Sequence, residues 1–411
     1  MSNRILLRLN TGAPDGSLFA TGFQHSYFKP CQWQVIADKI RDIQTADIIG
    51  NLTLGTTISI EFDKIGTILE DTKLDLTLSA VVGAGVGTYA RVCDFGGLAL
   101  VPQVQLTYQQ NVIQTQTNID LFVKYLRDHD ITHRRVFEYQ LGGRLSTAQR
   151  NTRATAPQTF RTYLKPYWYM LAGHCPIIVA LANKLKFKIS LAAAADFIQT
   201  DFTNQATVTL TAAQSVFEVI NTTGNDRDTF SRLTFTPAGQ TYLMEETHDI
   251  GYQTCAAGSA RNVLDLKGFV LPFSSQYFLI QRALDVTTPW AKKPFEFSAS
   301  DFNTYFSQLV VRDGSNANFI TLRSPFDVGD HWQKHNAKSQ YRVPNVIGYF
   351  PAEIADLKNI NLGSFNAANI NNFQLVIEWK AALPADFVVT IVNFEHNWVN
   401  HQGGELQTVF N

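Results

Sequence analysis

The stretch QVQLTYQQNVIQTQT (residues 103–117) decides the fold class, because it runs from strand to polar turn and back to strand. Apolar residues alternate there with polar or β-branched ones, and a period of two is typical of a half-buried β-strand. The stretch QLVVRDGSNANFITL (308–322) has the same plan, with Asn316 in the place of Asn111. We therefore predict a β-hairpin in each half of the chain.

A second pair of segments indicates that the two halves are related. CPIIVALANKLKFKISL (175–191) and FNAANINNFQLVIEWK (365–380) each contain small residues and Asn, followed by an alternating strand. Both pairs are offset by about 190–205 positions, and a common offset indicates an internal repeat. We predict a duplicated β-domain, with one copy at 51–225 and the other at 226–411.

Alternating segments continue through both halves. They lie at 57–64, 73–82, 163–171, 184–192, 206–220, 240–253, 265–273, 372–380 and 387–399. The chain also has 29 Phe residues, and aromatic side chains suit a pleated, half-buried surface. The sequence therefore predicts an all-β protein with its domain boundary near residues 221–229.

Helices are predicted at three places only. Apolar residues fall three and four apart over Trp33–Ile43, so we predict that residues 1–50 are an N-terminal arm with an amphipathic helix. A second helix is predicted over 118–126, where Asn118 can cap the first turn. A short third helix is predicted at Pro351–Lys358.

Two polar stretches, 140–162 and 324–344, are predicted to be loops, because their composition cannot fill a core. The first of them holds a basic cluster of Arg144, Arg150, Arg153 and Arg161. Aromatic residues that could stack on bases are few nearby. A solvated or intersubunit loop is favoured, and contact with an anion or nucleic acid remains the alternative.

Length and composition limit the function classes. The chain has 411 residues, 45% apolar and 17% charged, which suits two folded domains. Its formal net charge is −1, whereas a protein that coats nucleic acid carries a basic excess. We predict no sequence-specific nucleic-acid binding.

The sequence also gives expectations about the compartment. The four cysteines, Cys31, Cys93, Cys175 and Cys255, are far apart and suit buried thiols in a reducing compartment. We expect a soluble protein made in a cytosol, since neither a secretory signal nor a run of about 18–20 apolar residues is recognised. The two N-x-T sequons, at Asn51 and Asn221, then count as chance matches.

Histidine spacing offers two candidate metal pairs. His129 with His133, and His331 with His335, are four residues apart and would share one face of a helix. Neither pair forms an HExxH motif, and a structural role is favoured for both. The metal site of duplicated jelly-roll enzymes, the bicupins, needs a His-x-His, which the sequence lacks. We predict no metal site.

Other catalytic signatures are missing as well. The sequence has no GxSxG, and no cysteine lies in a known catalytic signature. GAGVGTY (83–89) lacks the lysine of a phosphate-binding loop, and DGSNAN (313–318) lacks the glycine and glutamate of a calcium loop. Both are predicted to be turns. We therefore predict a protein that is not an enzyme, with no catalytic residue and no cofactor.

The order of segments resembles the double jelly-roll major capsid proteins of icosahedral DNA viruses, such as nucleocytoplasmic large DNA viruses, virophages and tectiviruses. FDKIGTILEDTKLDLTLSAV (62–81) is similar to the first strand pair of that family, and RVCDFGGLALVPQVQLTYQQNVIQTQTNIDLFVKYL (91–126) to its hairpin and helix. LKPYWYMLAGHCPIIVALANKLKFKISL (164–191) resembles the end of the first barrel. Residues 347–379 resemble the Ser- and Asn-containing segment of the second.

The resemblance implies two tandem eight-stranded jelly-roll barrels with short helices in loops and at the N-terminus. It also implies a homotrimer that forms a pseudo-hexagonal capsomer in an icosahedral virion shell. Its expected partners are neighbouring capsomers, minor capsid or penton proteins and, through the N-terminal base, an internal virion membrane. Localisation in the virion follows, with synthesis in the host cytoplasm. The loops are shorter than in large eukaryotic-virus members, so outer towers should be modest.

Two other classes stay open. A glycan-binding or glycan-processing double jelly-roll protein would line a cleft with acidic residues and tryptophan from loops. Its candidates are Glu245, Glu246, Asp330 and Trp332. The other class is a minor capsid or spike protein of the same virus, which differs in copy number per virion.

Overall fold

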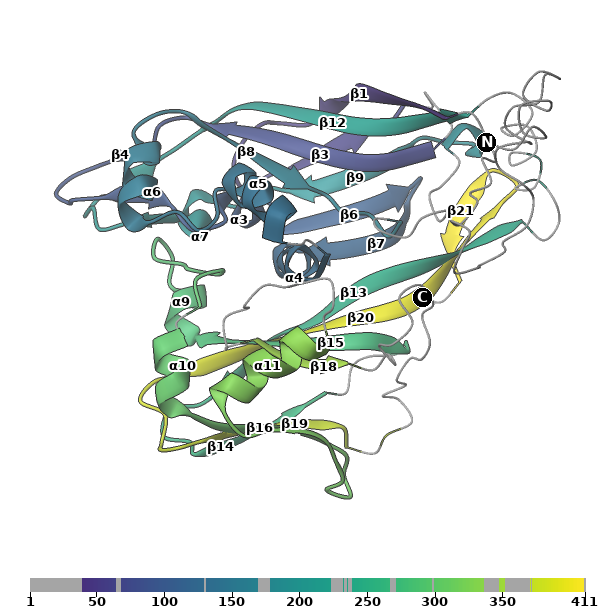
Figure 1. Cartoon of the computed structure of the whole chain (residues 1–411). Helices are drawn as coiled ribbons and strands as arrows, with labels where there is room; N and C mark the ends of the chain where they lie inside the picture. The colour runs from purple at the N-terminus through teal and green to yellow at the C-terminus, as the bar shows by residue number, and fades with distance from the viewer. Residues whose placement is uncertain are drawn as a thin grey trace, which may run out of the picture.

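Two β-barrels lie side by side, with helices between them (Figure 1). The structure is a computed structural model of the whole chain. It describes residues 39–63, 68–128, 131–168, 178–222, 239–266, 271–297, 299–335, 347–351 and 372–409, together with residues 232, 235 and 370.

The first barrel is one curled sheet of eight strands in the order β7-β6-β9-β2-β1-β12-β3-β8. Its strands are β1 (Lys39–Ile49), β2 (Thr57–Glu61), β3 (Ile68–Leu78), β6 (Gln103–Tyr108), β7 (Asn111–Thr117), β8 (Gln158–Tyr163), β9 (Leu185–Ser190) and β12 (Leu210–Thr222). Two short pairs extend one end, β4 (Val82–Gly83) with β11 (Ala206–Thr207) and β5 (Ala90–Val92) with β10 (Ile198–Thr200). Buried and partly exposed residues alternate over residues 72–78 of β3, where Leu74, Leu76 and Leu78 are fully buried.

The second barrel has two facing sheets. The first has the order β13-β20-β15-β18, with β21 added beside β20, and the second has the order β14-β19-β16-β17. The strands are β13 (Gln240–Cys255), β14 (Arg261–Asp265), β15 (Phe273–Arg282), β16 (Phe306–Arg312), β17 (Asn318–Leu322), β18 (Ile347–Pro351), β19 (Gln374–Trp379), β20 (Phe387–Gln402) and β21 (Glu405–Thr408).

The two barrels share one topology. In chain order, β1, β2, β3, β6, β7, β8, β9 and β12 correspond to β13 through β20. The order β1-β12-β3-β8 in the first barrel matches β13-β20-β15-β18 in the second, and β2-β9-β6-β7 matches β14-β19-β16-β17. Both are eight-stranded jelly rolls, so the predicted fold class is confirmed. The two predicted hairpins form as β6–β7 and β16–β17.

The N-terminal helix prediction is wrong where the structure describes it, because residues 39–49 form β1. Residues 39–46 pair with β12 and residues 47–49 with β2, so β1 joins the two layers of the first barrel. The Ile43 side chain is 70% exposed, so the three-and-four spacing did not mark a buried face. Ala46 and Ile48 pack against the core instead, with the period of a strand. Residues 33–38 lie outside the described residues.

Short helices connect the strands. They are α3 (Gly96–Ala99), α4 (Asn118–Asp128), α5 (Ile131–Leu141), α6 (Thr147–Ala154), η1 (Ile178–Ala180), α7 (Ala194–Phe197), α9 (Ala283–Thr287), α10 (Ala299–Tyr305) and α11 (Pro325–His335). The helix predicted at 118–126 is confirmed as α4. The helix predicted at 351–358 falls outside the described residues, except for Pro351 at the end of β18.

Both predicted polar loops need correction. The stretch 140–162 holds α6 and most of β8, and α6 begins with a capping box between Ser146 and Gln149. The stretch 324–344 holds α11. Local capping thus makes helices from polar sequence, which composition alone does not reveal.

Candidate functional site: the seam between the barrels

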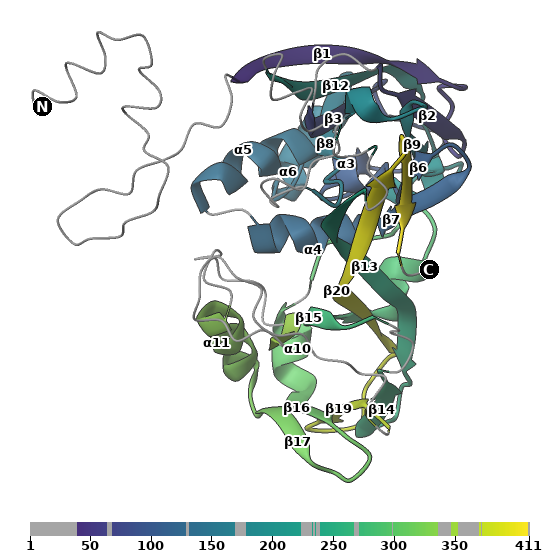
Figure 2. The same ribbon diagram turned by 90° about the vertical axis from the view of Figure 1, so that its right-hand side faces the viewer.

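The contact surface between the two barrels, here called the seam, combines aromatic packing, an ion pair and buried carboxyl groups. Helix α4 of the first barrel lies beside β13 and β20 of the second (Figures 1 and 2). The helix is amphipathic, with Asp120, Lys124 and Arg127 on one side, yet all of residues 119–126 are buried. The seam is therefore an internal surface and not an open cleft.

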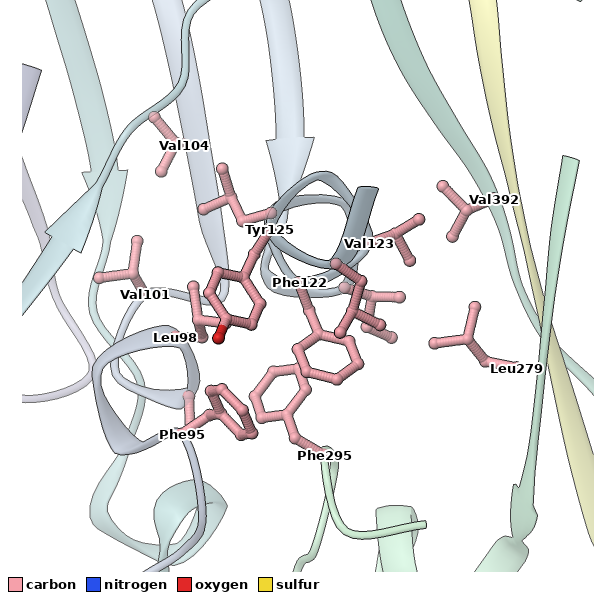
Figure 3. Close-up of a cluster of buried hydrophobic side chains, with 14 of the residues drawn as sticks. Phe95, Leu98, Val101, Val104, Phe122, Val123, Tyr125, Leu279, Phe295 and Val392 are labelled. Carbon is pink, nitrogen blue, oxygen red and sulfur yellow. The ribbon is translucent and has the colours of Figure 1, made fainter. Parts of the chain in front are cut away.

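Aromatic rings fill the middle of the seam (Figure 3). Phe295 of the second barrel packs on Phe122 of α4, with ring centroids 5.0 Å apart, and on Phe95 at 6.1 Å. Val123 faces Val392 of β20, and all of these side chains are buried. Burying a large apolar side chain contributes about 1.5–3 kcal/mol, so this cluster strongly favours the docked arrangement.

Arg127, near the end of α4, forms a two-pronged ion pair across the seam. Its two terminal nitrogens donate to the carboxylate oxygens of Glu245 on β13, at 2.6 and 2.9 Å. The same guanidinium lies 4.0 Å from the ring centroid of Phe394 on β20. The fork geometry of arginine fits a carboxylate, so the pair fixes the orientation as well as the distance.

The start of α4 brings two carboxyl groups together through Thr117. The Thr117 backbone N–H donates to Asp120 at 2.8 Å, and the Asp120 N–H donates to the Thr117 hydroxyl at 3.2 Å. That hydroxyl in turn donates to Asp249 of β13 at 2.8 Å. The residue that caps α4 is therefore Thr117, whereas the sequence suggested Asn118.

Burial raises the pKa of the Asp120 carboxyl to about 7. The neighbouring charge of Asp249 adds to this effect, while hydrogen bonds from Thr117 and the charge of Lys124 oppose it. Asp120 and Lys124 are 2% and 3% exposed, so both side chains are shielded from water. A carboxyl group in this setting holds its proton near neutral pH.

A second carboxyl pair lies on the facing strands. Glu246 of β13 is directly opposite Glu395 of β20 in the ladder. Burial raises the pKa of Glu395 to about 7, against a hydrogen bond from Asn393 and with the help of the Glu246 charge. Burial also raises the pKa of Glu246, against the side chain of Asn397 and the charge of Lys124.

A second contact between the barrels involves the segment from α9 to Phe297. The Trp290 N–H donates to the Ala195 carbonyl at 2.8 Å, and the Thr200 N–H donates to the Trp290 carbonyl at 3.0 Å. Arg150 of α6 donates to Glu296 at 2.5 Å. Burial would raise the pKa of Glu296, but its contacts with Arg150 outweigh burial and lower it.

The β20–β21 hairpin makes a third contact, at the other end of the molecule (Figure 1). The buried Tyr108 hydroxyl donates to the Gly404 carbonyl at 2.6 Å and accepts from the Asn183 N–H at 3.1 Å. The Ala182 N–H also donates to Gly404, at 2.8 Å. Three separated contacts thus hold the barrels together as one unit.

The residues proposed for a glycan cleft do not gather into one. Glu245 is bound by Arg127 inside the seam, and Glu246 is half-buried beside it. Asp330 is exposed on α11, which also carries Trp332. These residues thus divide between the seam and a surface helix.

The structure gives only part of the histidine pairs. His331 is half-buried on α11, His133 and His335 lie within α5 and α11, and His129 is outside the described residues. Among the residues that the structure describes, no group of three or more Asp, Glu, His or Cys side chains is arranged to hold a metal ion.

The four arginines, predicted to lie in a solvated or intersubunit loop, each contact another side chain of the chain, and only Arg144 lies outside a helix or strand. Arg144 pairs with Glu138 at 2.9 Å, and Arg161 pairs with Asp75 at 2.6 Å. Arg153 lies over the Tyr139 ring, at 5.0 Å from its centroid, and Arg150 bonds to Glu296. These guanidinium groups thus stabilise the fold around α5, α6 and β8.

The two glycine- or aspartate-rich segments are turns, as predicted. Around GAGVGTY, Asp201 accepts from the backbone N–H groups of Thr88 and Tyr89, both at 2.8 Å. In DGSNAN, Asp313 accepts from the N–H groups of Ser315 and Ala317, both at 2.9 Å, which closes the β16–β17 hairpin. Cys93 and Cys255 are buried free thiols, and Cys31 and Cys175 lie outside the described residues.

Sequence reasoning missed the charged residues of the seam, above all Asp120, Lys124 and Glu395. The sequence of α4 is amphipathic, with its charged residues on one side, and that pattern predicts a solvated polar face. The structure instead places this charged face against the second barrel, where Arg127 pairs with Glu245. No helix of the described chain is long and apolar enough to cross a membrane.

The solved structures with a similar architecture include viral major capsid proteins. VP54 of PBCV-1, as fitted into the virophage Sputnik, superposes with a TM-score of 0.73 at 14% identity, over 94% of this chain and 100% of that one. The Faustovirus major capsid protein superposes with a TM-score of 0.69 at 9% identity, over 97% of both chains. The mavirus major capsid protein superposes with a TM-score of 0.56 at 10% identity, over 95% of both chains.

The chain therefore has the double jelly-roll fold of these capsid proteins. At such low identity the likeness establishes the fold. No protein-family model matches the sequence, and no curated protein matches it either.

Proposed function

We propose that this chain is the major capsid protein of an icosahedral virus. The observation that carries the proposal is the repetition of one eight-stranded topology in two barrels that are held together by three contacts. The solved structures with this fold support it, because those compared above are capsid proteins. The role is structural, and the charged seam residues serve the architecture.

The proposed assembly is a homotrimer. Three copies of two similar barrels give six similar units around one axis, which is the shape of a pseudo-hexagonal capsomer. Such a ring uses the same contact from one subunit to the next and closes after three. A sixfold-like outline allows close packing in a shell, and a formal net charge of −1 limits repulsion between neighbouring copies.

Further partners follow from the same proposal. The trimers would contact neighbouring capsomers and minor or penton proteins of the virion, and would be made in the host cytoplasm. Residues 1–38, which lie outside the described residues, are proposed to act at the base of the capsomer, towards other capsomers or an internal membrane.

Light scattering of the purified full-length protein tests the trimer. We expect a single species of three times the 46.0 kDa chain mass at micromolar concentration. A chain that lacks residues 1–30 should give the same species but fail to form shells. A stable monomer of the full-length protein under these conditions would contradict the proposal.

A further inference from the structure

Helix α11 of the second barrel is the structural equivalent of α4 in the first. Each helix has 11 residues and follows the second strand of a hairpin, β7 or β17. The Asp120 N–H donates to the Thr117 hydroxyl at 3.2 Å. In the same way, the Asp327 N–H donates to the Ser324 hydroxyl at 3.1 Å. This shared cap aligns the two helices residue by residue.

Equivalent positions on the two helices differ in burial. Ile119 and Val123 of α4 are 9% and 0% exposed, and Val123 faces Val392 of the second barrel (Figure 3). The positions aligned with them on α11 are Phe326 and Asp330, about one turn apart. Phe326 is 75% exposed, and Asp330 is exposed as well. The face of α4 that meets the other barrel therefore corresponds to an uncovered face of α11.

The first barrel has an uncovered face of the matching kind. Strands β1 and β12 correspond to β13 and β20, on which Thr247 and its ladder partner Phe394 are buried in the seam. On β1, by contrast, the Ile43 side chain is 70% exposed and the Arg41 side chain 66%. These two residues lie on the same face of the strand, because they are two positions apart. Each chain thus carries an uncovered equivalent of both halves of the seam.

We propose that the α11 face of one copy packs on the outer face of β1 and β12 in a second copy, at a surface here called the ring contact. The contact between copies then repeats the seam within each chain. Phe326 and Asp330 belong to one half of the ring contact, and Arg41 and Ile43 to the other. The inference rests on the proposed trimer and specifies the two surfaces that close it.

The positions of the two faces fit a closed ring. In Figure 2, β1 lies at the top of the first barrel and α11 at the left of the second, and both are away from the seam. The two halves of the ring contact lie on different barrels, so their meeting requires a second copy. A contact between two different faces of one chain forms a ring when successive rotations close. Three chains of two barrels each close in this way if the ring contact repeats the seam.

The ring contact combines apolar and charged groups. Phe326 and Ile43 supply one large apolar side chain from each half. Arg41 donates to Glu70 at 3.1 Å, and its guanidinium carries further donors that a carboxylate can accept. The exposed Asp330 supplies such a carboxylate from the opposite half. Opposite charges at the edge of an apolar contact favour one orientation of the two copies.

Light scattering of full-length variants tests the ring contact. Phe326→Lys and Ile43→Lys each place a charge in one half, and both positions are exposed in the single chain, so each variant should fold. Losing the burial of one large apolar side chain weakens every contact in the ring by about tenfold to a hundredfold. Both variants should therefore shift from three chain masses to one. The control is Val263→Lys, at an exposed position of β14 away from α11, and it should stay trimeric (Figure 2).

A second measurement uses the parent protein and does not depend on the folding of a variant. Hydroxyl radicals oxidise exposed aromatic side chains, and mass spectrometry locates the oxidised residues. In the parent trimer, Phe326 should be oxidised as slowly as the buried Phe306, although it is 75% exposed in the single chain. In Ile43→Lys, whose substitution lies in the other barrel, the oxidation of Phe326 should rise.

The alternative cover for these faces is the chain's own residues 1–38, which lie outside the described residues. A chain that lacks residues 1–30 should keep Phe326 protected in its trimer, and faster oxidation in an intact trimer would overturn the ring contact. Trimeric Phe326→Lys and Ile43→Lys variants, or rapid oxidation of Phe326 in the parent trimer, would also overturn it and leave the trimer standing. A monomeric parent protein would refute the trimer and the ring contact together.

Discussion

Gly142 shows how one residue positions an element of the first barrel. It follows α5 with a φ of +73°, and a Cβ atom there would lie 2.5 Å from Cε1 of Phe160. A residue with a side chain would meet both backbone strain and a buried ring of β8. Both the positive φ and the close approach of the Phe160 ring therefore require glycine at this helix end.

We expect Gly142→Ala to lower the free energy of unfolding by about 2–4 kcal/mol, measured by denaturant titration. Gly258→Ala is the matched control, because Gly258 has a φ of +80° and no atom within 4 Å of the added Cβ. Gly258→Ala should lower the free energy of unfolding by about 1 kcal/mol. If both variants lose the same free energy of unfolding, the contact with Phe160 does not contribute to the effect of Gly142→Ala.

The contact between α4 and β13 depends on the Arg127–Glu245 pair. Removing either partner leaves the other charged and partly buried. Arg127→Met and Glu245→Gln should therefore each lower the free energy of unfolding by about 1–3 kcal/mol. A double-mutant cycle should give a coupling energy above about 1 kcal/mol. The exposed pair of Lys184 and Asp63 is the control and should couple by about 0–1 kcal/mol. Equal coupling in the two pairs would mean that the seam pair is no stronger than a surface one.

The elements differ in how far the sequence predicts them. The hairpins β6–β7 and β16–β17 are visible from alternation and turn residues, because both signals are local. Strand β1 is not, since its conformation is set by pairing with β12 and β2, which are distant in sequence or in the opposite layer. Helix α6 was not predicted because its composition is polar, although the two residues of its capping box, Ser146 and Gln149, can be recognised in the sequence.

For the molecule as a whole, the repeat was predictable and the seam was not. A common offset between similar segments survives in the sequence because each barrel needs the same alternation. The contacts of Thr117 with Asp249, and of Glu246 with Glu395, come from residues over a hundred positions apart. No local pattern records such a contact, and the amphipathic sequence of α4 does not reveal that its charged side is buried.

The central claim is that one chain supplies two equivalent barrels to a closed threefold unit. Cryo-electron microscopy of the purified full-length protein tests it most directly. We expect particle averages with six barrel densities around a threefold axis, alternating between two slightly different shapes. Averages that show a single pair of barrels, or a ring with another number of subunits, would contradict it.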